Sequence, residues 1–523
     1  MRQSILSRVV FCLLIAILPL TVRAGSFALS EHSVSGLGTA FAGGAASAED
    51  VSTLFYNPAG LARLDQGEFQ MGLHLIVPSA EFNNEGTRYN LPGTPFNGLP
   101  VHGTNGGDGG VSHIIGNMYM SQPLFRNTPY GDLTVGLGVT TPFGLETDYS
   151  PDWVGRYAAL RTKLTTIDIQ PTVSWRWDRF SLGASLDIQR ASARLTQAID
   201  FGLAAQAPLA QFYAALPAVL AAQHVPPAQI PGIIAATVAA YQGAGFVPGG
   251  RDGVTEITGD DWALGLTVGA LFEYRKKGEG EDGCLQDGRI GFSYRSKIDH
   301  TLEGDAEFRR VPLIAAAGAP PLPAFPSPTA FQAIFFNQGV TANLDLPDIM
   351  HFSIYQRFAH QFAVMGDVTW THWSRLQEVP IVFDNPGTPT NILAINYEDA
   401  LRYSVGFEWY VCKSLTLRAG GAYDETPIQG PDFRTPRVPD NNRYWMSFGA
   451  RYSPRDWMDI DVGYAHLFVD DPHTTFTDNQ GHQLIGTYDA QVNIVSASLT
   501  IKWGGPREVT KTYAKDTKDV YRK

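Results

Sequence analysis

Residues 401–411, LRYSVGFEWYV, alternate apolar and polar side chains with a period of two. Because successive side chains of a β-strand point to opposite faces, one face of this stretch is apolar and the other is polar. Residues 162–177, 458–464 and 492–503 repeat the pattern. These runs are generally longer than the five or six residues usual in globular strands. The sequence therefore predicts an all-β protein built from many long strands.

Fourteen candidate strands of this type follow one another from residue 68 onward. Their expected ranges are 68–82, 111–123, 131–147, 160–178, 179–199, 260–275, 287–306, 343–359, 360–384, 395–411, 413–428, 442–455, 457–471 and 489–503. The links after even-numbered strands are mostly tight turns, whereas those after odd-numbered strands are longer. Short turns at one end, long loops at the other and an even strand number are typical of outer-membrane barrels. We therefore expect a 14-stranded antiparallel transmembrane β-barrel over residues 67–503.

Aromatic residues gather where the tight turns begin and end, as Trp175, Trp177 and Phe180 do beside residues 178–179. Such residues form girdles at the membrane interfaces of barrels. The alternative, a soluble sandwich of strands, needs no girdle. Barrel closure also pairs every backbone group, as lipid requires. These features favour the barrel and predict the bacterial outer membrane as its location.

The N-terminus indicates export. Residues 1–24 combine Arg2 and Arg8, an apolar run at 9–20 and small residues before position 25, as in a cleaved secretory signal. No later apolar run approaches about 20 residues, so no spanning helix is expected. The net charge of −12 and the lack of a basic stripe argue against a nucleic-acid partner. Residues 504–523, charged and poor in apolar side chains, are expected to form a periplasmic tail.

Residues 36–62, GLGTAFAGGAASAEDVSTLFYNPAGLA, are too rich in small residues to form a membrane strand. Their glycines permit close backbone turns and small contacts. At the end of the stretch Pro58 fixes φ and lacks a donor, while Asn57 can bond to nearby backbone. Asn57, Pro58 and Ala59 are therefore expected to form a rigid corner. We predict that residues 25–66 form a hatch that plugs the barrel.

Two long links carry helical signals. Residues 201–246 are rich in Ala and Leu and are predicted to form short helices broken by Pro208, Pro217 and Pro226-Pro227. Residues 311–339 combine a Pro-rich turn with the run TAFQAIFFN. The apolar faces of these two loops either pack on each other as a cap or form a landing groove for a hydrophobic ligand.

Several motifs resemble those of the FadL-type long-chain fatty acid transporters and the related TodX-type importers of aromatic hydrocarbons. They cover nearly the whole mature chain and include SGLGTAFAGGAASAED and FYNPAGLA near the start, TPFGLETDY at 141–149, YRSKIDHTLEGD at 294–305, YEDALRYSVGFEWY at 397–410 and VPDNNRYWMSFGARY at 438–452. The resemblance implies a hatch-closed barrel that imports fatty acids or aromatic hydrocarbons by passive diffusion. It implies no enzymatic step and no cofactor, and it places a lateral exit where the third strand kinks.

An apolar route suits such cargo, because each methylene exposed to water costs about 0.8 kcal/mol. The third strand carries Gly136, Gly138, Pro142 and Gly144, residue types that weaken or interrupt a ladder. We expect the kink and the lateral opening between Gly136 and Gly144; the alternative is that the glycines only give curvature. Phe27 is expected either to fill an inner pocket beside the kink or simply to anchor the hatch.

A carboxylate headgroup favours arginine, whose guanidinium can bind it through two hydrogen bonds. Arg190 and Arg194 occupy a segment near the outer end of the fifth strand that is similar to one supplying such a residue in fatty acid transporters. Arg402 and Arg418 face the expected lumen. All four are candidate ligand-binding residues, and each could instead pair with acidic residues of the barrel. The family's basic residue before the tenth strand is replaced by residues 396–399, NYED, which keeps an uncharged hydrophobic ligand as an alternative.

Other functions have weaker support. A polar diffusion porin is the runner-up, and a lipase would lack the Gly-x-Ser-x-Gly nucleophile motif. The histidines show no metal-ligand spacing, so no metal site is predicted. Cys284 and Cys412 lie in different expected turns, and we do not expect them to pair. The expected partners are a hydrophobic small-molecule ligand, outer-membrane lipid and the barrel assembly machinery during biogenesis.

Overall fold

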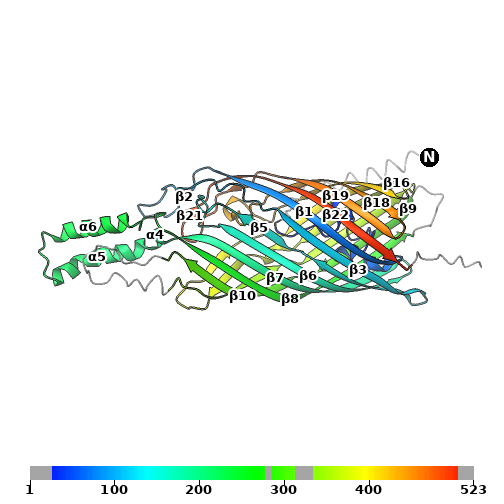
Figure 1. Cartoon of the computed structure of the whole chain (residues 1–523), viewed down its shortest axis with the longest axis horizontal. Coiled ribbons are helices and arrows are strands. Elements are labelled where there is room, and N and C mark those ends of the chain that lie inside the picture. The colour runs from blue at the N-terminus through cyan, green and yellow to red at the C-terminus, as the bar shows by residue number, and fades with distance from the viewer. Residues whose placement is uncertain (1–25, 277–284, 312–333, 505–523) are drawn as a thin grey trace, which may run out of the picture.

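The computed structural model describes residues 26–276, 285–311 and 334–504. Its strands form a closed antiparallel wall, because β1 (Gly67–Asn84) pairs with β22 (Gly486–Trp503) on one side and with β3 (His113–Thr128) on the other. The strands are tilted around a long cylinder (Figure 1). The circuit contains 14 strands, which confirms the predicted barrel, and the soluble sandwich is wrong.

Several wall strands consist of two segments. In chain order after β3, the wall contains β4 (Gly131–Thr140) with β5 (Gly144–Asp148), β6 (Arg161–Trp177), β7 (Phe180–Asp200), β8 (Asp252–Arg275), β9 (Leu285–Arg295) with β10 (Ile298–Arg309), β11 (Gln338–Leu346) with β12 (Ile349–Phe358), β13 (Phe362–Thr371) with β14 (Glu378–Phe383), β15 (Asn391–Ala394) with β16 (Ala400–Cys412), β17 (Leu415–Asp424), β18 (Arg443–Arg455), β19 (Met458–Val469) with β20 (His473–Thr474), and β22. A separate pair, β2 (Arg88–Tyr89) and β21 (His482–Gln483), joins two loops.

Side chains alternate across the wall. Outward-facing Leu73, Leu264 and Val405 are exposed, as lipid-facing residues of a barrel must be. Inward-facing Asp168 and Arg295 are buried and form an ion pair. Polar and charged side chains therefore point inward at this level of the barrel, which is the reverse of a soluble core.

Three helices link β7 to β8 at the loop-rich end: α4 (Phe201–Ala204), α5 (Gln206–Ala222) and α6 (Ile230–Gly243). Figure 1 shows α5 and α6 projecting beyond the barrel. The prediction that Pro208 and Pro217 break helices is wrong, since both lie within α5. Pro208 stands in the first turn, where its missing N–H is not needed. Phe212 and Tyr213 of α5 pack on Tyr241 of α6, and this packing supports the helix.

The expectation that no apolar run of about 20 residues follows residue 24 needs correction. Residues Phe201–Ala222 form a helix that, by length and composition, is long and apolar enough to cross a membrane. It is the only such helix among the described residues. This helix belongs to the loop between two wall strands, so length and hydropathy alone do not make it a membrane span. Residues 312–333, most of the second predicted helical loop, lie outside the described residues, as do residues 1–25 and 505–523 of the predicted signal and tail.

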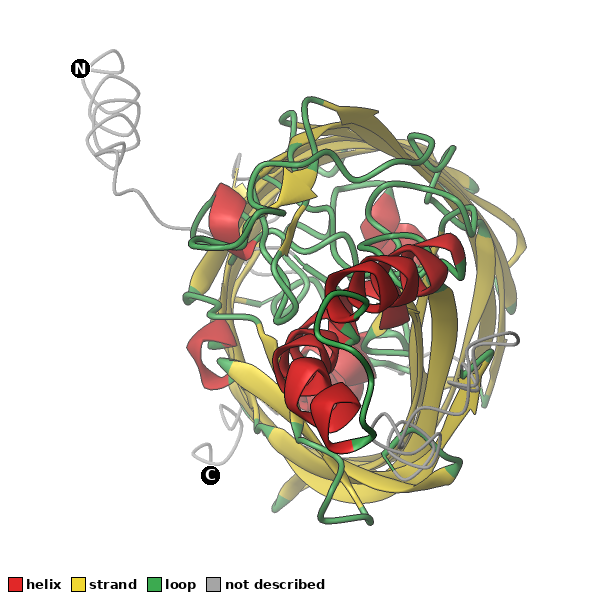
Figure 2. Cartoon of the chain, turned by 90° about the vertical axis from the view of Figure 1, so that its left-hand side faces the viewer, coloured by secondary structure: helices red, strands yellow, loops and turns green. Residues whose placement is uncertain are grey.

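The hatch residues 26–66 lie inside the barrel, with α2 (Val34–Leu37), α3 (Thr53–Tyr56) and a 3₁₀ turn, η1 (Pro58–Arg63). Figure 2 looks into the barrel from the loop-rich end, where the strands form a ring around the lumen. Two paired wall glycines receive the hatch: a Cβ on Gly183 would lie 2.3 Å from the Pro58 carbonyl carbon, and one on Gly269 would lie 1.9 Å from Asn57 Oδ1. The wall therefore lacks side chains where the hatch backbone approaches it.

Candidate functional site

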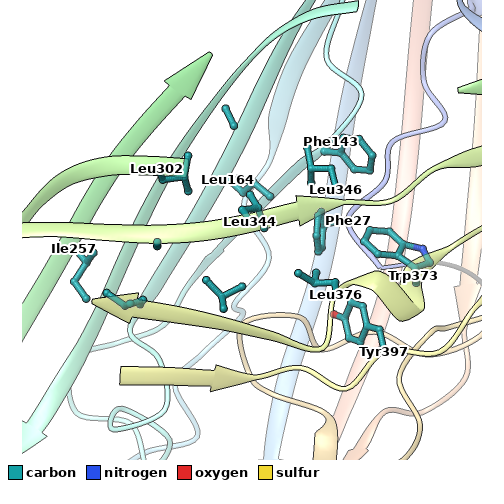
Figure 3. Packing of buried hydrophobic residues seen from close by; sticks show 14 of the residues in the cluster. Phe27, Phe143, Leu164, Ile257, Leu302, Leu344, Leu346, Trp373, Leu376 and Tyr397 are labelled. Atoms are coloured by element: carbon teal, nitrogen blue, oxygen red, sulfur yellow. The ribbon is translucent and has the colours of Figure 1, made fainter. Parts of the chain in front are cut away.

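Three aromatic side chains pack together inside the barrel (Figure 3), and one of them, Phe27, lines an apolar pocket. The ring centroid of Phe27, from the hatch, lies 4.7 Å from that of Trp373 and 6.1 Å from that of Phe143. These contacts are edge-to-face, an arrangement that aromatic quadrupoles favour. All three side chains are buried. Phe27 thus lies at the inner end of the pocket, and it also anchors the start of the hatch there.

Aliphatic side chains that face inward from neighbouring strands form the walls of the pocket. They include Leu164, Leu195, Ile257, Leu302, Val340 and Ile381. The cavity has a volume of about 530 Å³, which is in the usual range for small-molecule sites. Burying an alkyl or aryl ligand here is favourable by roughly 25 cal/mol for each Å² of apolar surface removed from water.

Breaks in the wall strands supply the aromatic side chains that pack around Phe27. The sequence predicted continuous third, ninth and tenth strands, but the wall strands are interrupted at residues 141–143, 372–377 and 395–399. These interruptions carry Phe143, Trp373 and Tyr397. Because the chain leaves the ladder at each break, the aromatic side chains can enter the lumen, and the rings of Trp373 and Tyr397 meet at 5.7 Å.

The N-terminal segment of the hatch is hydrogen-bonded to the break in the third strand. The Gly144 N–H donates to the Phe27 carbonyl at 3.0 Å, and the Leu29 N–H donates to the Pro142 carbonyl at 2.9 Å. These bonds flank an antiparallel bridge between Ala28 and Phe143. The hatch therefore occupies a backbone edge that a neighbouring wall strand would otherwise use.

The wall lacks backbone pairing over a short stretch beside this bridge, where the side chains of His113 and Glu146 meet at 2.9 Å. The β3–β4 ladder ends at the pair Met118–Val139, and the next pairing toward the loop-rich end joins Gly110 to Thr147. Between these points, residues 113–117 of β3 pair with β1 on their other side. We call this gap the lateral window. It separates the third strand from β3 beside the inner end of the pocket.

The residues expected at the kink fall into two groups. Pro142 lies in the break itself and Gly144 begins β5 directly after it. Gly136 and Gly138 instead lie in regular ladder with both β3 and β6. The break in the third strand therefore lies toward the Pro142 end of the expected interval. Gly136 and Gly138 make room for the hatch, since a Cβ on either would approach Leu54 to 3.0 Å or less.

The Asn57-Pro58-Ala59 corner bonds the hatch to itself and to the wall. Asn57 Nδ2 donates to the Ala45 carbonyl at 2.7 Å and to the Ala270 carbonyl at 3.0 Å. Asn57 Oδ1 accepts from the Ala59 N–H. All three residues of the corner are buried. The corner is thus a structural joint between hatch and barrel, at a different place from the apolar pocket.

Two inward-facing arginines hold an acidic turn of the hatch. Arg418 pairs with Glu49 and, at 2.9 Å, with Asp461. Arg451 pairs with Glu49 at 2.9 Å and with Asp50 at 2.6 Å. Burial opposes the ionisation of Asp50, but Arg451 and hydrogen bonds from serine hydroxyls hold its pKa below the usual range. We call Glu49, Asp50, Arg418, Arg451 and Asp461 the hatch latch.

Arg402 and Arg418, the two candidate ligand-binding residues expected to face the lumen, contact the hatch. Arg418 belongs to the hatch latch. Arg402 donates to the Ala40 carbonyl at 3.0 Å, and its guanidinium lies over the rings of Phe41 and Trp445. Neither side chain lines the apolar pocket.

Arg190 and Arg194 lie on the outer face of the barrel. Arg190 pairs with Asp260 at 3.1 Å and Arg194 with Glu256 at 2.6 Å, and both side chains are 44% exposed. These two candidate ligand-binding residues therefore lie outside the lumen, as the alternation of side chains along β7 shows. Both have the parity of Leu182, an exposed lipid-facing residue, so the period-two pattern already contained this signal.

Sequence reasoning missed the arginine that does line the pocket. Arg437, in the loop between β17 and β18, contributes to the cavity wall together with Thr162 and Gln197. Nothing in its local sequence distinguishes it from the other arginines of that loop. Its position at the pocket depends on contacts between segments far apart in the chain.

A second cavity lies on the opposite side of the hatch, toward the tight turns. It measures about 1250 Å³ and is lined largely by charged side chains, among them Arg63, Glu68, Arg176, Asp287 and Lys502. We call this cavity the polar vestibule. Its charged lining gives an alkyl chain no more favourable an environment than water does. The apolar lining therefore ends at the hatch.

The described residues hold no group of three or more His, Cys, Asp or Glu side chains arranged for a metal ion. Cys412 is exposed and unpaired in that part of the chain. Cys284, its only candidate partner in the mature sequence, lies outside the described residues.

Comparisons with known proteins identify relatives along nearly the whole chain. An outer membrane protein of Neisseria meningitidis serogroup B is 29% identical over 478 residues, covering 90% of this chain and 92% of the relative. A long-chain fatty acid transport protein of Escherichia coli is 26% identical over 485 residues, covering 92% and 94%.

Solved structures share the fold. A Pseudomonas aeruginosa FadL homologue matches with a TM-score of 0.72 at 23% identity, covering 92% of this chain and all of that one. The P. putida toluene transporter TodX matches with a TM-score of 0.57 at 16% identity, covering 87% and 95%. The model of the outer membrane protein transport family (OMPP1/FadL/TodX) matches residues 15–503. The chain therefore belongs to this family of outer-membrane transport proteins.

Proposed function

We propose that the protein imports hydrophobic compounds across the outer membrane by passive diffusion, with long-chain fatty acids as the leading cargo and aromatic hydrocarbons as the alternative. One observation carries this proposal: an apolar cavity of about 530 Å³ lies inside a hatch-closed barrel, with its inner end beside the lateral window. Relatives named for fatty acid and for toluene transport support both cargoes.

The ligand enters the pocket from the loop-rich end and stops at Phe27. Movement of the segment containing Phe27 and Leu29 breaks its two hydrogen bonds to the third strand and connects the pocket with the lateral window. A net backbone hydrogen bond contributes about 1 kcal/mol, so thermal motion can break the two bonds reversibly. The ligand then leaves sideways into outer-membrane lipid, where its apolar surface is never returned to water.

The polar porin is disfavoured by the hatch. The hatch residues Leu37, Leu54 and Leu61 are fully buried, so the hatch fills the lumen at that level. Transport along the apolar route needs no covalent step and no cofactor. In addition to the ligand and outer-membrane lipid, the barrel assembly machinery is a proposed partner during biogenesis.

A reversible disulfide tests the sideways route. Ala28 and Phe143 are partners in a bridge flanked by hydrogen bonds, a pairing in which Cα atoms lie about 4.5 Å apart. This separation suits a disulfide. In an Ala28→Cys/Phe143→Cys variant, oxidation should fix the N-terminal segment and abolish uptake of a fluorescent fatty acid by a bacterial host that lacks its own importer.

The same variant after reduction is the matched control, and it should regain uptake. The Ala28→Cys and Phe143→Cys single variants report the effect of each side chain alone. Full uptake by the oxidised double variant, with the disulfide verified by mass spectrometry, would overturn the sideways route.

A further inference from the structure

Arg437 differs from the buried arginines of the hatch latch by its partners. Its side chain is 8% exposed. Nη1 donates to Thr162 Oγ1 at 3.1 Å, and Nη2 donates to Gln197 Oε1 at 2.6 Å. Both acceptors are neutral, and no carboxylate of the described residues pairs with this guanidinium. By contrast, Arg451 and Arg156 each reach a carboxylate within 2.9 Å.

A buried cation without a counter-ion is unfavourable, because its lost hydration is not replaced by an opposite charge. Two of the five guanidinium N–H groups are used by the bonds to Thr162 and Gln197. Burial lowers the pKa of Arg437 to about 10, so the side chain remains charged at neutral pH. The remaining N–H groups are available to an anion.

Arg437 and Phe27 lie toward opposite ends of the pocket. Along β6, Thr162 contacts Arg437, Leu164 lines the wall, and Thr166 hydrogen-bonds to the backbone of Phe143 beside Phe27. Four residues of strand correspond to about 13 Å. The pocket therefore has a cationic group at one end and an apolar wall over a length suited to an alkyl chain.

The other charged residues that border the pocket already have partners. Lys163 pairs with Glu146 at 2.7 Å. Asp478 pairs with His482 at 2.8 Å. Arg437 is therefore the charged group of the pocket lining that lacks a counter-ion among the described residues.

We propose that Arg437 binds the carboxylate of a hydrophobic acid, so that the pocket takes long-chain acids in preference to uncharged compounds of the same length. The proposal rests on the import function above. The guanidinium provides charge-assisted hydrogen bonds to the headgroup while the alkyl chain extends along the aliphatic wall toward Phe27. The proposal therefore assigns the preference for acids to Arg437, which is not one of the four arginines expected from the sequence.

The test compares two probes of equal chain length, hexadecanoate and hexadecanol, by titration of the full-length protein in amphipol. The wild type should bind the acid more tightly than the alcohol. Arg437→Gln should weaken acid binding by about tenfold or more, which corresponds to the loss of a charged hydrogen bond, and should leave alcohol binding unchanged. Arg437→Lys keeps the charge but loses the planar guanidinium that can donate two parallel hydrogen bonds. It should therefore weaken acid binding to an intermediate degree.

Arg190→Gln is the matched control, since Arg190 faces outward and should leave both affinities unchanged. Equal losses for both probes in Arg437→Gln would mean that the residue only shapes the pocket, and would overturn the proposal. If the wild type binds the alcohol or toluene but not the acid, this proposal fails while the import function stands. If the wild type binds none of the probes, both fail.

Discussion

Arginines are buried both at the hatch and at the pocket, but in opposite electrostatic settings. At the hatch, Arg418 pairs with Glu49 and Asp461, and Arg451 with Glu49, Asp50 and Asp461, so each guanidinium has carboxylate partners. At the pocket, Arg437 meets only neutral acceptors. The ion-paired Arg418 and Arg451 hold the hatch to the wall, whereas Arg437 is left with capacity for an external anion. The difference separates a structural joint from a recognition element.

The largest expected effect comes from removing the hatch. Deletion of residues 25–66 should convert a nearly silent barrel into one that conducts ions steadily in a planar bilayer. The reason is that the hatch fills the lumen between the apolar pocket and the polar vestibule, and the vestibule is already lined by charged groups. A deletion variant that remains silent, although folded by its heat-modifiable gel mobility, would contradict the assignment of these residues as the plug.

The next effect separates the two kinds of arginine. Arg451→Ala leaves Asp50 and Asp461 buried with less compensation, and should lower the free energy of unfolding by about 3–5 kcal/mol. Arg437→Gln removes no carboxylate's partner and should leave stability near that of the wild type. Urea or thermal unfolding in detergent measures both. Arg455→Ala, an exposed arginine of the same strand as Arg451, is the control. Equal destabilisation by Arg451→Ala and Arg437→Gln would remove the distinction.

A smaller effect is expected from crowding the hatch corner. Gly269→Ala places a Cβ 1.9 Å from Asn57 Oδ1, so the corner must shift, at a cost of about 1–3 kcal/mol. The variant should show raised conductance with unchanged acid binding at the pocket. Gly366→Ala is the matched control, because its Cβ meets its nearest atom only at 3.7 Å. If Gly269→Ala instead lowered ligand affinity and left conductance unchanged, the hatch and the pocket would not be independent.

The smallest effect is a dependence on acid. The pKa of Asp50 is depressed in the folded state, so its stabilising contribution is complete above its unfolded value of about 3.9 and is lost as the pH falls below that through the folded pKa. Bilayer conductance should therefore be low from pH 7 to 5 and rise below about pH 4. Asp50→Asn should conduct more than the wild type at pH 7 and lose part of this acid response. An identical acid response in Asp50→Asn would assign it to other groups.

Much of the barrel could be predicted because its determinants are local. The period of two in residues 401–411 reports which side chains face lipid, and the contrast between tight and long links orders the strands. The alternation of side chains along β7 could also have placed Arg190 and Arg194 on the outer face of the barrel, because both are an even number of residues from lipid-facing Leu182. The break at residues 141–143 was anticipated in part, because Pro142 cannot donate to a ladder.

The sequence by itself determined the alternating wall, the small-residue hatch and the end of the barrel that carries the long loops, since each follows from side-chain period, size or link length. Only the tertiary structure decided which breaks turn Phe143, Trp373 and Tyr397 into the lumen, and which arginines find carboxylates there. The physical reason is that pairing and burial depend on neighbours far apart in sequence. Arg437 meets Gln197 across 240 positions of chain, a contact that no local pattern reports.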